Sequence, residues 1–200
     1  MTNRIKVFSG FMSASVGFEY AEQNGFDIVL GNELNPIRAD WSRDKHPKAE
    51  IVQGSFTDPK IFSYLVRRSK EEKIDLACFS PNCQPFSKAG KQHLHSPEAF
   101  LFLYILKYIE LTKVPAAWIE NAEEFCKAVL ADDPRTVEQR IRDALEPLGY
   151  HIEAKIQDSA GFLTPQHRRR TIILISRIGI WKHPIECEEK DYITSKMAID

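Results

Sequence analysis

Cysteine, glycine and proline are all scarce in this sequence. Its 200 residues include 4 cysteines, 9 glycines and 11 prolines. Four cysteines without the paired spacing of metal ligands are too few for a disulfide-stapled secreted scaffold, which indicates a reducing compartment. The low glycine and proline content excludes collagen-like and low-complexity chains. We therefore expect a cytoplasmic protein that binds no metal.

Long apolar runs and an excess of one charge are also missing. No run approaches the roughly 18 residues of a membrane-spanning helix, and residues 1–6 lead into a short apolar stretch without a signal-peptide core. We expect neither membrane association nor export. Lys and Arg number 27 against 28 Asp and Glu, so the net charge is −1. Because the chain as a whole lacks a positive charge excess, any contact with nucleic acid must be local.

What the sequence does contain is an alternation of short, β-branched apolar runs with longer amphipathic segments. This alternation predicts a single α/β domain with helices on both faces of a doubly wound, mostly parallel sheet. Strands are predicted at residues 5–8, 27–30, 50–52, 74–79, 116–119, 151–156 and 171–175, and helices at about 16–24, 36–45, 59–73, 97–113 and 134–148. Asn35, Asp58 and Ser96 each precede a proline and are predicted to cap three of these helices.

Ligands of such sheets bind at the carboxyl ends of the strands. The first strand runs into Phe8-Ser9-Gly10-Phe11, where a glycine would let backbone amides approach a polar ligand. A tight turn without a ligand is the alternative interpretation. Glu33 follows the second strand and suits the hydroxyls of a ribose, whereas a solvated loop acid is the alternative there.

Cys83 lies in an unusual position after the fourth predicted strand. It stands between Asn82 and Gln84, and prolines 81 and 85 flank that triplet. Prolines restrict the backbone and would hold a thiol that must attack a substrate atom. The alternative is a surface cysteine in a rigid loop.

The segment 82–87, NCQPFS, resembles the nucleophile loop of the DNA (cytosine-5)-methyltransferases, usually written Pro-Cys-Gln-x-Phe-Ser. Further strings follow in that family's order. They are residues 8–10 with 17–18, the pair Asn32-Glu33, the triplet Glu120-Asn121-Ala122 and residues 166–170, QHRRR. The resemblance extends over about residues 5–176 and implies a Rossmann-like S-adenosylmethionine-dependent methyltransferase fold.

The resemblance assigns a catalytic role to each of five residues. Cys83 is the thiolate that adds to carbon 6 of cytosine, which turns carbon 5 into a nucleophile. Glu120 shares a proton with ring nitrogen 3, and Asn121 holds the loop. Arg168 offers donors to the base carbonyl and favours the thiolate, and Arg170 supports the site from behind. A solvated basic edge is the alternative for the arginines.

The resemblance also implies a cofactor and a substrate. S-adenosylmethionine is the expected methyl donor, and the residues expected to contact it are Phe8, Ser9, Gly10, Phe11, Glu33, Leu34, Ser55 and Pro81. DNA that contains the target cytosine is the expected substrate, in the manner of restriction-modification enzymes. Lys88, Lys91 and the arginines around Arg168 would supply local phosphate contacts.

Several positions depart from the family's pattern. Met12 and Ser13 replace two glycines of the first motif, so side chains stand where backbone should approach the cofactor. Asn82 replaces the proline beside the thiol, which we expect to free the local backbone. Residues 53–55 lack the acid that commonly contacts the adenine amine, and Ala122 replaces a valine.

The family's target-recognition region and last two motifs have no counterpart in this sequence. We expect residues 1–180 to form the catalytic domain and residues 181–200 to begin a linker toward a missing recognition region. The chain is then a truncated piece, one subunit of a split enzyme whose partner polypeptide carries that region, or a repurposed homologue. Three functions stay open: DNA cytosine-5 methylation, a non-catalytic module of the same fold, and the same chemistry on RNA or a free pyrimidine nucleotide.

Overall fold

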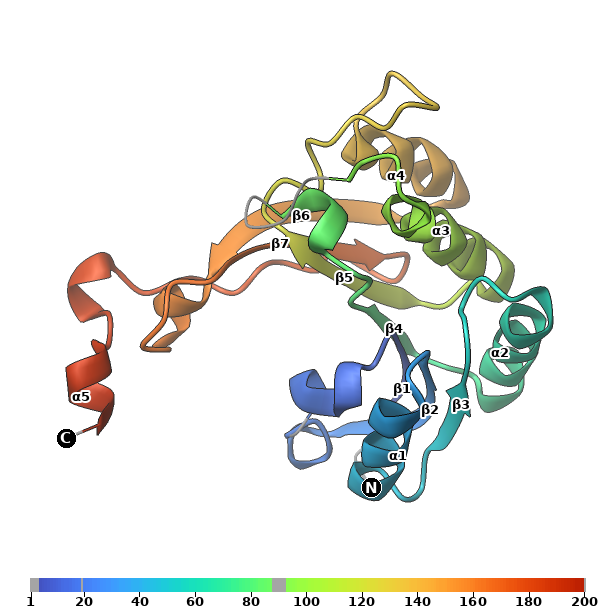
Figure 1. The fold of residues 1–200 in the computed structure, drawn as a ribbon, viewed down its shortest axis with the longest axis horizontal. Helices are drawn as coiled ribbons and strands as arrows, with labels where there is room; N and C mark the ends of the chain where they lie inside the picture. Colours follow the sequence, from blue (N-terminus) through green and yellow to red (C-terminus); the bar gives the residue numbers. More distant parts are fainter. Residues whose placement is uncertain (1–3, 19, 88–92, 200) are drawn as a thin grey trace.

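The fold is built on one seven-stranded sheet. The computed structural model describes residues 4–18, 20–87 and 93–199. The strand order is β3-β2-β1-β4-β5-β7-β6 (Figure 1). The strands are β1 (Ile5–Gly10), β2 (Phe26–Glu33), β3 (Glu50–Gln53), β4 (Leu76–Phe79), β5 (Ala116–Ala122), β6 (His151–Asp158) and β7 (Arg169–Ser176). The first five pair in parallel and β7 is antiparallel to both β5 and β6, so the predicted doubly wound, mostly parallel sheet is confirmed.

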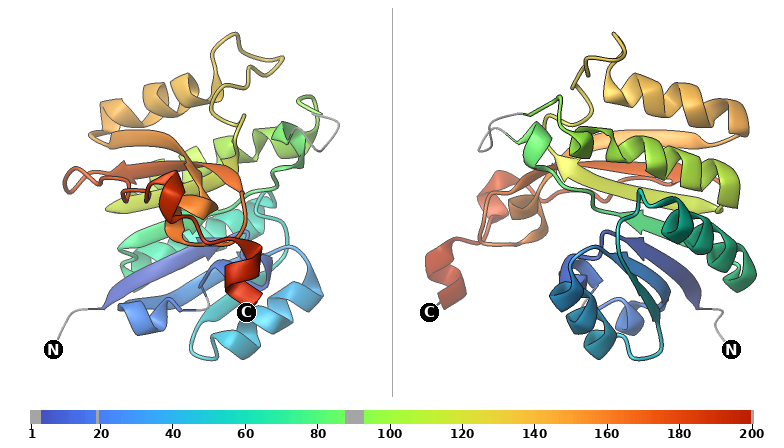
Figure 2. Two further views of the ribbon diagram at one scale, coloured as in Figure 1. Left: turned by 90° about the vertical axis from the view of Figure 1, so that its left-hand side faces the viewer. Right: turned by 45° about the vertical axis from the view of Figure 1, so that its right-hand side comes forward.

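Helices cover the two faces unequally. The α-helices are α1 (Pro36–Lys45), α2 (Pro59–Glu72), α3 (Leu101–Thr112), α4 (Val137–Leu145) and α5 (Ser195–Ile199). Helices α2, α3 and α4 lie side by side on one face (Figure 2). On the other face, α1 packs on β2 and β3 together with the 3-10 helix η1 (Ser13–Phe18).

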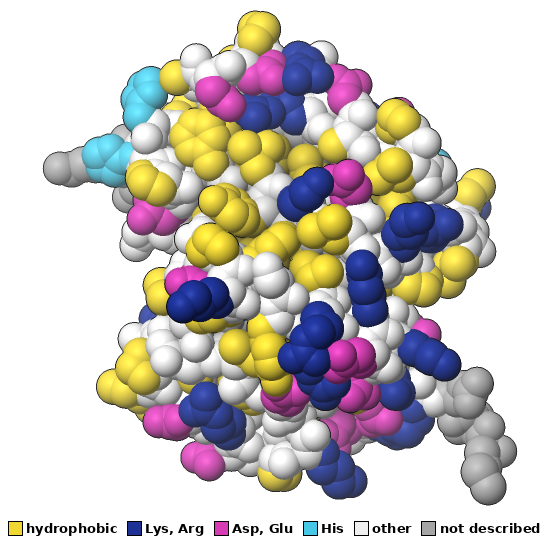
Figure 3. Space-filling view, turned by 90° about the vertical axis from the view of Figure 1, so that its right-hand side faces the viewer, with side chains coloured by type: hydrophobic (Ala, Val, Ile, Leu, Met, Phe, Trp, Pro, Cys, Tyr) yellow, Lys and Arg dark blue, Asp and Glu magenta, His cyan; other side chains and the backbone are white. Residues whose placement is uncertain are grey.

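The outer surface of the α2–α3 layer mixes charges of both signs with apolar side chains (Figure 3). Arg68 of α2, for example, makes ion pairs with Glu50, Glu71 and Glu72. Of the helices in the described part of the chain, none is long and apolar enough to cross a membrane.

Helix starts follow the sequence signals closely. Asn35 accepts a hydrogen bond from the amide of Arg38, and Asp58 accepts from the amides of Lys60 and Ile61, as N-caps do. Ser96 precedes a helical turn at Pro97–Phe100 but makes no side-chain cap bond. Helix α4 begins at Val137 rather than near residue 134, because Thr136 and Gln139 form a capping box.

The helix predicted at residues 16–24 is wrong. Two short 3-10 helices, η1 and η2 (Glu22–Asn24), take its place. A regular helix cannot form through η1, because Ala14 and Ser15 have φ of 61° and 59°. Gly25, with φ of 86°, ends η2 and leads into β2.

Strand boundaries also differ from the prediction in ways that matter for the site. Strand β5 continues through Ala122, so Glu120 and Asn121 lie in the strand rather than after it. Strand β7 begins at Arg169, so Arg170 is a strand residue as well. The backbone of each of these residues is therefore held by the hydrogen bonds of the sheet, which fixes where its side chain begins.

An aromatic cluster forms the centre of the core between the sheet and α2–α3. The Phe8 ring lies 4.8 Å from Tyr108 and 5.7 Å from Phe79, centroid to centroid, and Phe56 packs on all three. The Tyr108 hydroxyl is hydrogen-bonded to Ser69 at 2.5 Å. Because such rings contribute about 1.5–3 kcal/mol each when buried, this cluster fixes β1 and β4 beneath the site.

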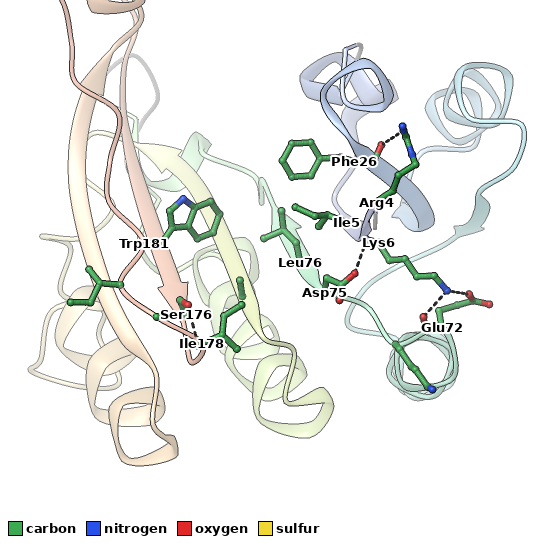
Figure 4. A pocket seen from close by; sticks show the side chains of 14 residues that line it. Arg4, Ile5, Lys6, Phe26, Glu72, Asp75, Leu76, Ser176, Ile178 and Trp181 are labelled. Carbon is green, nitrogen blue, oxygen red and sulfur yellow. Dashed lines mark hydrogen bonds and ion pairs between the residues drawn. The ribbon is translucent and has the colours of Figure 1, made fainter. Parts of the chain in front are cut away.

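The opposite face of the central strands is partly open. A cavity of about 840 Å³ lies beside the amino ends of β1, β2, β4 and β5. Figure 4 shows Phe26 and Leu76 on one side of it and Trp181 on the other. A second cavity of about 470 Å³ adjoins it and is lined by Val7, Cys78, Trp118 and Trp181 among others. We call these two cavities together the apolar trough.

The Asp58 cap gives a test of the fold. Replacing Asp58 by Ala removes the acceptor for two orphan amides at the start of α2, so the free energy of unfolding should fall by about 1 kcal/mol. Urea denaturation followed by circular dichroism measures the change. Ser63→Ala, on the exposed side of the same helix, is the matched control and should change stability by less than about 0.5 kcal/mol. Equal stability of Asp58→Ala and wild type would contradict the capping role.

Candidate active site

Parallel pairing of β4 with β5 brings two of the predicted motifs together. Phe79 is the register partner of Ile119, so the chain leaves β4 at Ser80 beside Glu120 of β5. Cys83 lies three residues beyond Ser80. Both strands point the same way, and the nucleophile loop and the Glu120 motif therefore lie on one edge of the sheet.

Asn121 ties the Cys83 loop to β5. Its side-chain amide donates a hydrogen bond to the Pro81 carbonyl at 3.1 Å and its side-chain oxygen accepts from the Ala122 amide at 2.8 Å. Asn121 is fully buried, so these bonds are shielded from water. The bond to Pro81 joins the Cys83 loop to β5.

Asn82 does not leave the backbone beside the thiol free, and that expectation is wrong. Its side-chain oxygen accepts from the amide of Gln84 at 3.1 Å, which closes an Asx turn around Cys83. A helical turn, Gln84–Phe86, follows directly, and Phe86 packs edge-on against Phe125 at 4.8 Å. The side-chain bond restricts the backbone where a proline ring would otherwise do so.

Glu120 contacts two other segments, one through a hydrogen bond and the other through an ion pair. The Ser80 hydroxyl donates to Oε2 at 2.5 Å, and Arg170 Nε lies 3.0 Å from Oε1. The Glu120 side chain retains 18% of its exposure, so it is partly desolvated and still reachable from outside. Sequence reasoning overlooked Ser80, although its position directly after a strand that neighbours the Glu120 strand was a usable signal.

The three arginines of the QHRRR string have different environments. Arg169 forms an ion pair with Glu123 at 3.0 Å, and Arg170 pairs with Glu120. Arg168 is exposed and its backbone amide donates to Asp158. Within the described ranges, no partner is found for the Arg168 guanidinium. Its charge is therefore available to a ligand.

Asp158 anchors the turn that carries Arg168. Its carboxylate accepts from the Arg168 amide at 3.0 Å and lies 3.0 Å from Nδ1 of His167. The hydrogen bond with His167 holds the pKa of Asp158 below its ordinary value. A stable carboxylate at Asp158 fixes the start of β7 close to the site.

The residues expected to contact a cofactor gather at the carboxyl ends of β1, β2 and β4, and most are enclosed. Phe8, Ser9 and Glu33 are at most 5% exposed, whereas Leu34 is 64% exposed. Gly10 and Pro81 are also buried, and Phe11 and Ser55 are half-buried. Phe8 belongs to the aromatic cluster described above.

Glu33 already accepts two backbone hydrogen bonds. Its carboxylate oxygens take the amides of Ser13 at 2.8 Å and Asn35 at 2.9 Å. Phe11, Ser13, Ala14 and Ser15 all have positive φ values, between 48° and 61°. The Met12 side chain is buried and lies over Gly31, where an added Cβ would meet its sulfur at 2.1 Å. The segment 11–15 therefore folds over the acid.

The donor set at this edge fits the adenosyl part of S-adenosylmethionine in its chemistry. Each Glu33 oxygen keeps a second lone pair for a ribose hydroxyl, and the exposed Leu34 side chain lies next to it along the chain. Ser55 adds a hydroxyl at the end of β3.

The apolar trough does not coincide with this site. The apolar trough lies at the amino ends and on the open face of the strands, away from the carboxyl edge that carries Cys83 and Glu120. Its lining is mostly apolar and has no catalytic side chains. Lys88 and Lys91, expected to contact phosphates, lie outside the described residues. Among the residues that are described, no cluster of three His, Cys, Asp or Glu side chains could hold a metal ion.

The four cysteines fall into two classes. All are free thiols; Cys78 and Cys126 are buried, and Cys83 and Cys187 are half-buried. Burial raises the pKa of the Cys78 and Cys126 thiols to about 12 in each case. Only the half-buried pair is thus available for reaction at neutral pH.

Comparison with known proteins places this geometry in context. A profile described as C-5 cytosine-specific DNA methylase matches residues 2–198. The Type II methyltransferase M1.HgaI of Avibacterium volantium is 32% identical over 195 residues, which are 93% of this chain and 54% of that protein. M1.HphI of Haemophilus parahaemolyticus is 28% identical, with 88% of this chain and 46% of that protein covered. The chain thus spans about half the length of these curated relatives.

A solved structure supports the fold. The Entamoeba histolytica methyltransferase EhMeth superimposes with a TM-score of 0.70 at 14% identity. The superposition covers 95% of this chain and 58% of that chain. At this level of identity the likeness concerns the fold alone.

Thiol labelling tests the two cysteine classes. Iodoacetamide at pH 8 should modify Cys83 and Cys187 in the native protein, because almost no thiolate exists at groups whose pKa is about 12. Mass spectrometry of peptides measures the sites, and protein unfolded in guanidinium, in which all four should react, is the control. Native labelling of Cys78 in preference to Cys83 would contradict the structure.

Proposed function

Because the chain belongs to the C-5 cytosine-specific DNA methylase family, we propose that it transfers a methyl group from S-adenosylmethionine to carbon 5 of cytosine in DNA. The transfer proceeds through a transient bond between Cys83 and carbon 6. The observation that carries the proposal is the shared edge on which Ser80 and Arg170 hold Glu120 beside the Cys83 loop.

Cys83 begins the reaction. Its thiolate adds to carbon 6 of the ring, and the displaced electron pair makes carbon 5 an enamine-type nucleophile. The thiol is half-buried in a loop fixed by Asn121 and by the Asx turn of Asn82, so its position is set before substrate arrives. After transfer, carbon 5 loses its proton and the sulfur leaves carbon 6, which restores the aromatic ring.

Glu120 stabilises the charge that the addition pushes toward ring nitrogen 3. A carboxyl group that shares a proton with that nitrogen does this best in a partly desolvated site. Arg170 supports the acid by its ion pair, and the exposed Arg168 guanidinium is left to contact the base carbonyl or a phosphate.

S-adenosylmethionine supplies an electrophilic methyl group when it is bound. Glu33 would take the ribose hydroxyls, with Leu34 against the adenosyl group and Gly10, Phe11 and Ser55 around it. A ribose hydroxyl on the Oε2 side of Glu33 would compete with the Ser13 amide for that oxygen.

The target cytosine must leave the duplex to reach Cys83, at a cost of a few kcal/mol. The curated relatives are about twice as long as the region matched here. We place the catalytic domain at residues 1–180 and interpret residues 181–200 as the start of a linker toward a target-recognition region.

A non-catalytic module is the second candidate, and the enclosed Glu33 favours it. If the segment 11–15 stays over the acid, the cofactor is excluded and the fold binds DNA or a partner without turnover. Tight binding of S-adenosylmethionine in a calorimeter would count against this candidate.

Covalent trapping tests the proposal. A DNA duplex with 5-fluorocytosine at the target position should form a stable adduct with the full methyltransferase, because fluorine at carbon 5 cannot leave as a proton does. Denaturing gels measure the adduct, and Cys83→Ala should give none while Cys187→Ala reacts as the wild type does. RNA and free nucleotide substrates are compared in the same assay.

Failure to trap the adduct with the recognition polypeptide present would overturn the enzymatic proposal. A preference for RNA over DNA would change the substrate and keep the thiol chemistry.

A further inference from the structure

We propose that Ser80 is a positioning residue, whose hydroxyl orients the Glu120 carboxyl group for its contact with the substrate base. The inference rests on the proposed function and extends it to a residue to which the resemblance assigns no role.

The register of β4 and β5 places Ser80 next to Glu120. Phe79 of β4 is paired with Ile119 of β5, so the next residue on each strand, Ser80 and Glu120, lie side by side at the carboxyl edge. The Ser80 hydroxyl donates to Oε2 of Glu120 at 2.5 Å. Hydrogen bonds from hydroxyl to carboxylate at this length are among the stronger ones in proteins.

An ion pair at the other oxygen complements the hydrogen bond from Ser80. Arg170 Nε lies 3.0 Å from Oε1 of Glu120. The terminal torsion of a glutamate is broad, so a carboxyl group without a directional bond is free to turn. The directional bond comes from the Ser80 hydroxyl on one oxygen, and the Arg170 charge lies beside the other oxygen, on the opposite side of β5.

The clamp still leaves room for the base. The side chains of Glu120 and Arg170 retain 18% and 23% of their exposure, and Oε2 keeps one lone pair after it accepts from Ser80. Glu120 can thus meet a substrate atom while the Ser80 bond and the Arg170 ion pair stay in place.

Ser80 also links the acid to the nucleophile. Ser80 and Cys83 belong to one short segment, whose backbone is held at Pro81 by Asn121 and at Gln84 by Asn82. Loss of the hydroxyl releases Glu120 from this segment without removing the thiol or its loop contacts. Small displacements of a reacting group lower rates strongly, so the effect should fall on turnover.

The test uses the full methyltransferase with a cognate duplex. Ser80→Ala and Ser80→Gly should each lower kcat about tenfold with little change in KM for DNA or for S-adenosylmethionine. Ser80→Thr keeps the hydroxyl and should restore most of the rate. Ser63→Ala on α2, far from this edge, is the matched control.

Coupling to Glu120 separates positioning from a merely structural role. In a Glu120→Ala background the hydroxyl has no carboxyl to orient, so adding Ser80→Ala should not slow adduct formation with 5-fluorocytosine DNA further. Two results would overturn the inference: wild-type rates in Ser80→Ala and Ser80→Gly, or an equal loss of rate from Ser80→Ala in the wild-type and Glu120→Ala backgrounds. In either case, methylation by the wild type leaves the proposed function intact. A wild type without activity would instead reject the function itself.

Discussion

The parallel register of β4 and β5 is the constraint on which the site depends. Pairing of Phe79 with Ile119 brings the end of one strand beside the middle of the other, and the contacts of Ser80 with Glu120 and of Asn121 with Pro81 follow from that placement. Asn121 reaches the Pro81 carbonyl, and Ser80 reaches Glu120, only because the two backbones are one strand spacing apart. The antiparallel strand β7 then adds Arg170 from the other side. A shift of one residue would turn these side chains to the opposite face.

The carboxyl edge of the sheet has two parts, one around Cys83 and one around Glu33, and they differ in how open they are to a ligand. On the side of Cys83, the Asn82 side chain that replaces the family's proline makes a hydrogen bond, so the loop is fixed in spite of the substitution. On the side of Glu33, the backbone amide of Ser13 is bonded to the carboxylate, and the backbone around it takes a costly left-handed conformation.

Most of the fold could be predicted from the sequence, because its signals are local. Apolar runs marked the strands, and Asn35 and Asp58 marked two helix starts by the hydrogen bonds they make. The segment after β1 could not be predicted, since the apolar periodicity of residues 16–24 suggests one helix whereas the chain forms two short 3-10 helices there. The site shows the same division. The motifs identified Cys83 and Glu120. The contact between Ser80 and Glu120 could not be identified in the same way, because it depends on the pairing of β4 with β5, and β4 ends at Phe79 whereas β5 begins only at Ala116.

Tryptophan side chains in the apolar trough make the intrinsic fluorescence of the chain sensitive to this surface. Three tryptophans are present in the sequence, and two of them, Trp118 and Trp181, line the trough, whereas Trp41 is 57% exposed on α1. Indole emission shifts to shorter wavelength as water leaves its surroundings. The fluorescence of this chain therefore carries a signal from the uncovered side of the sheet, where any polypeptide or amphiphile that settles on it would register as a blue shift.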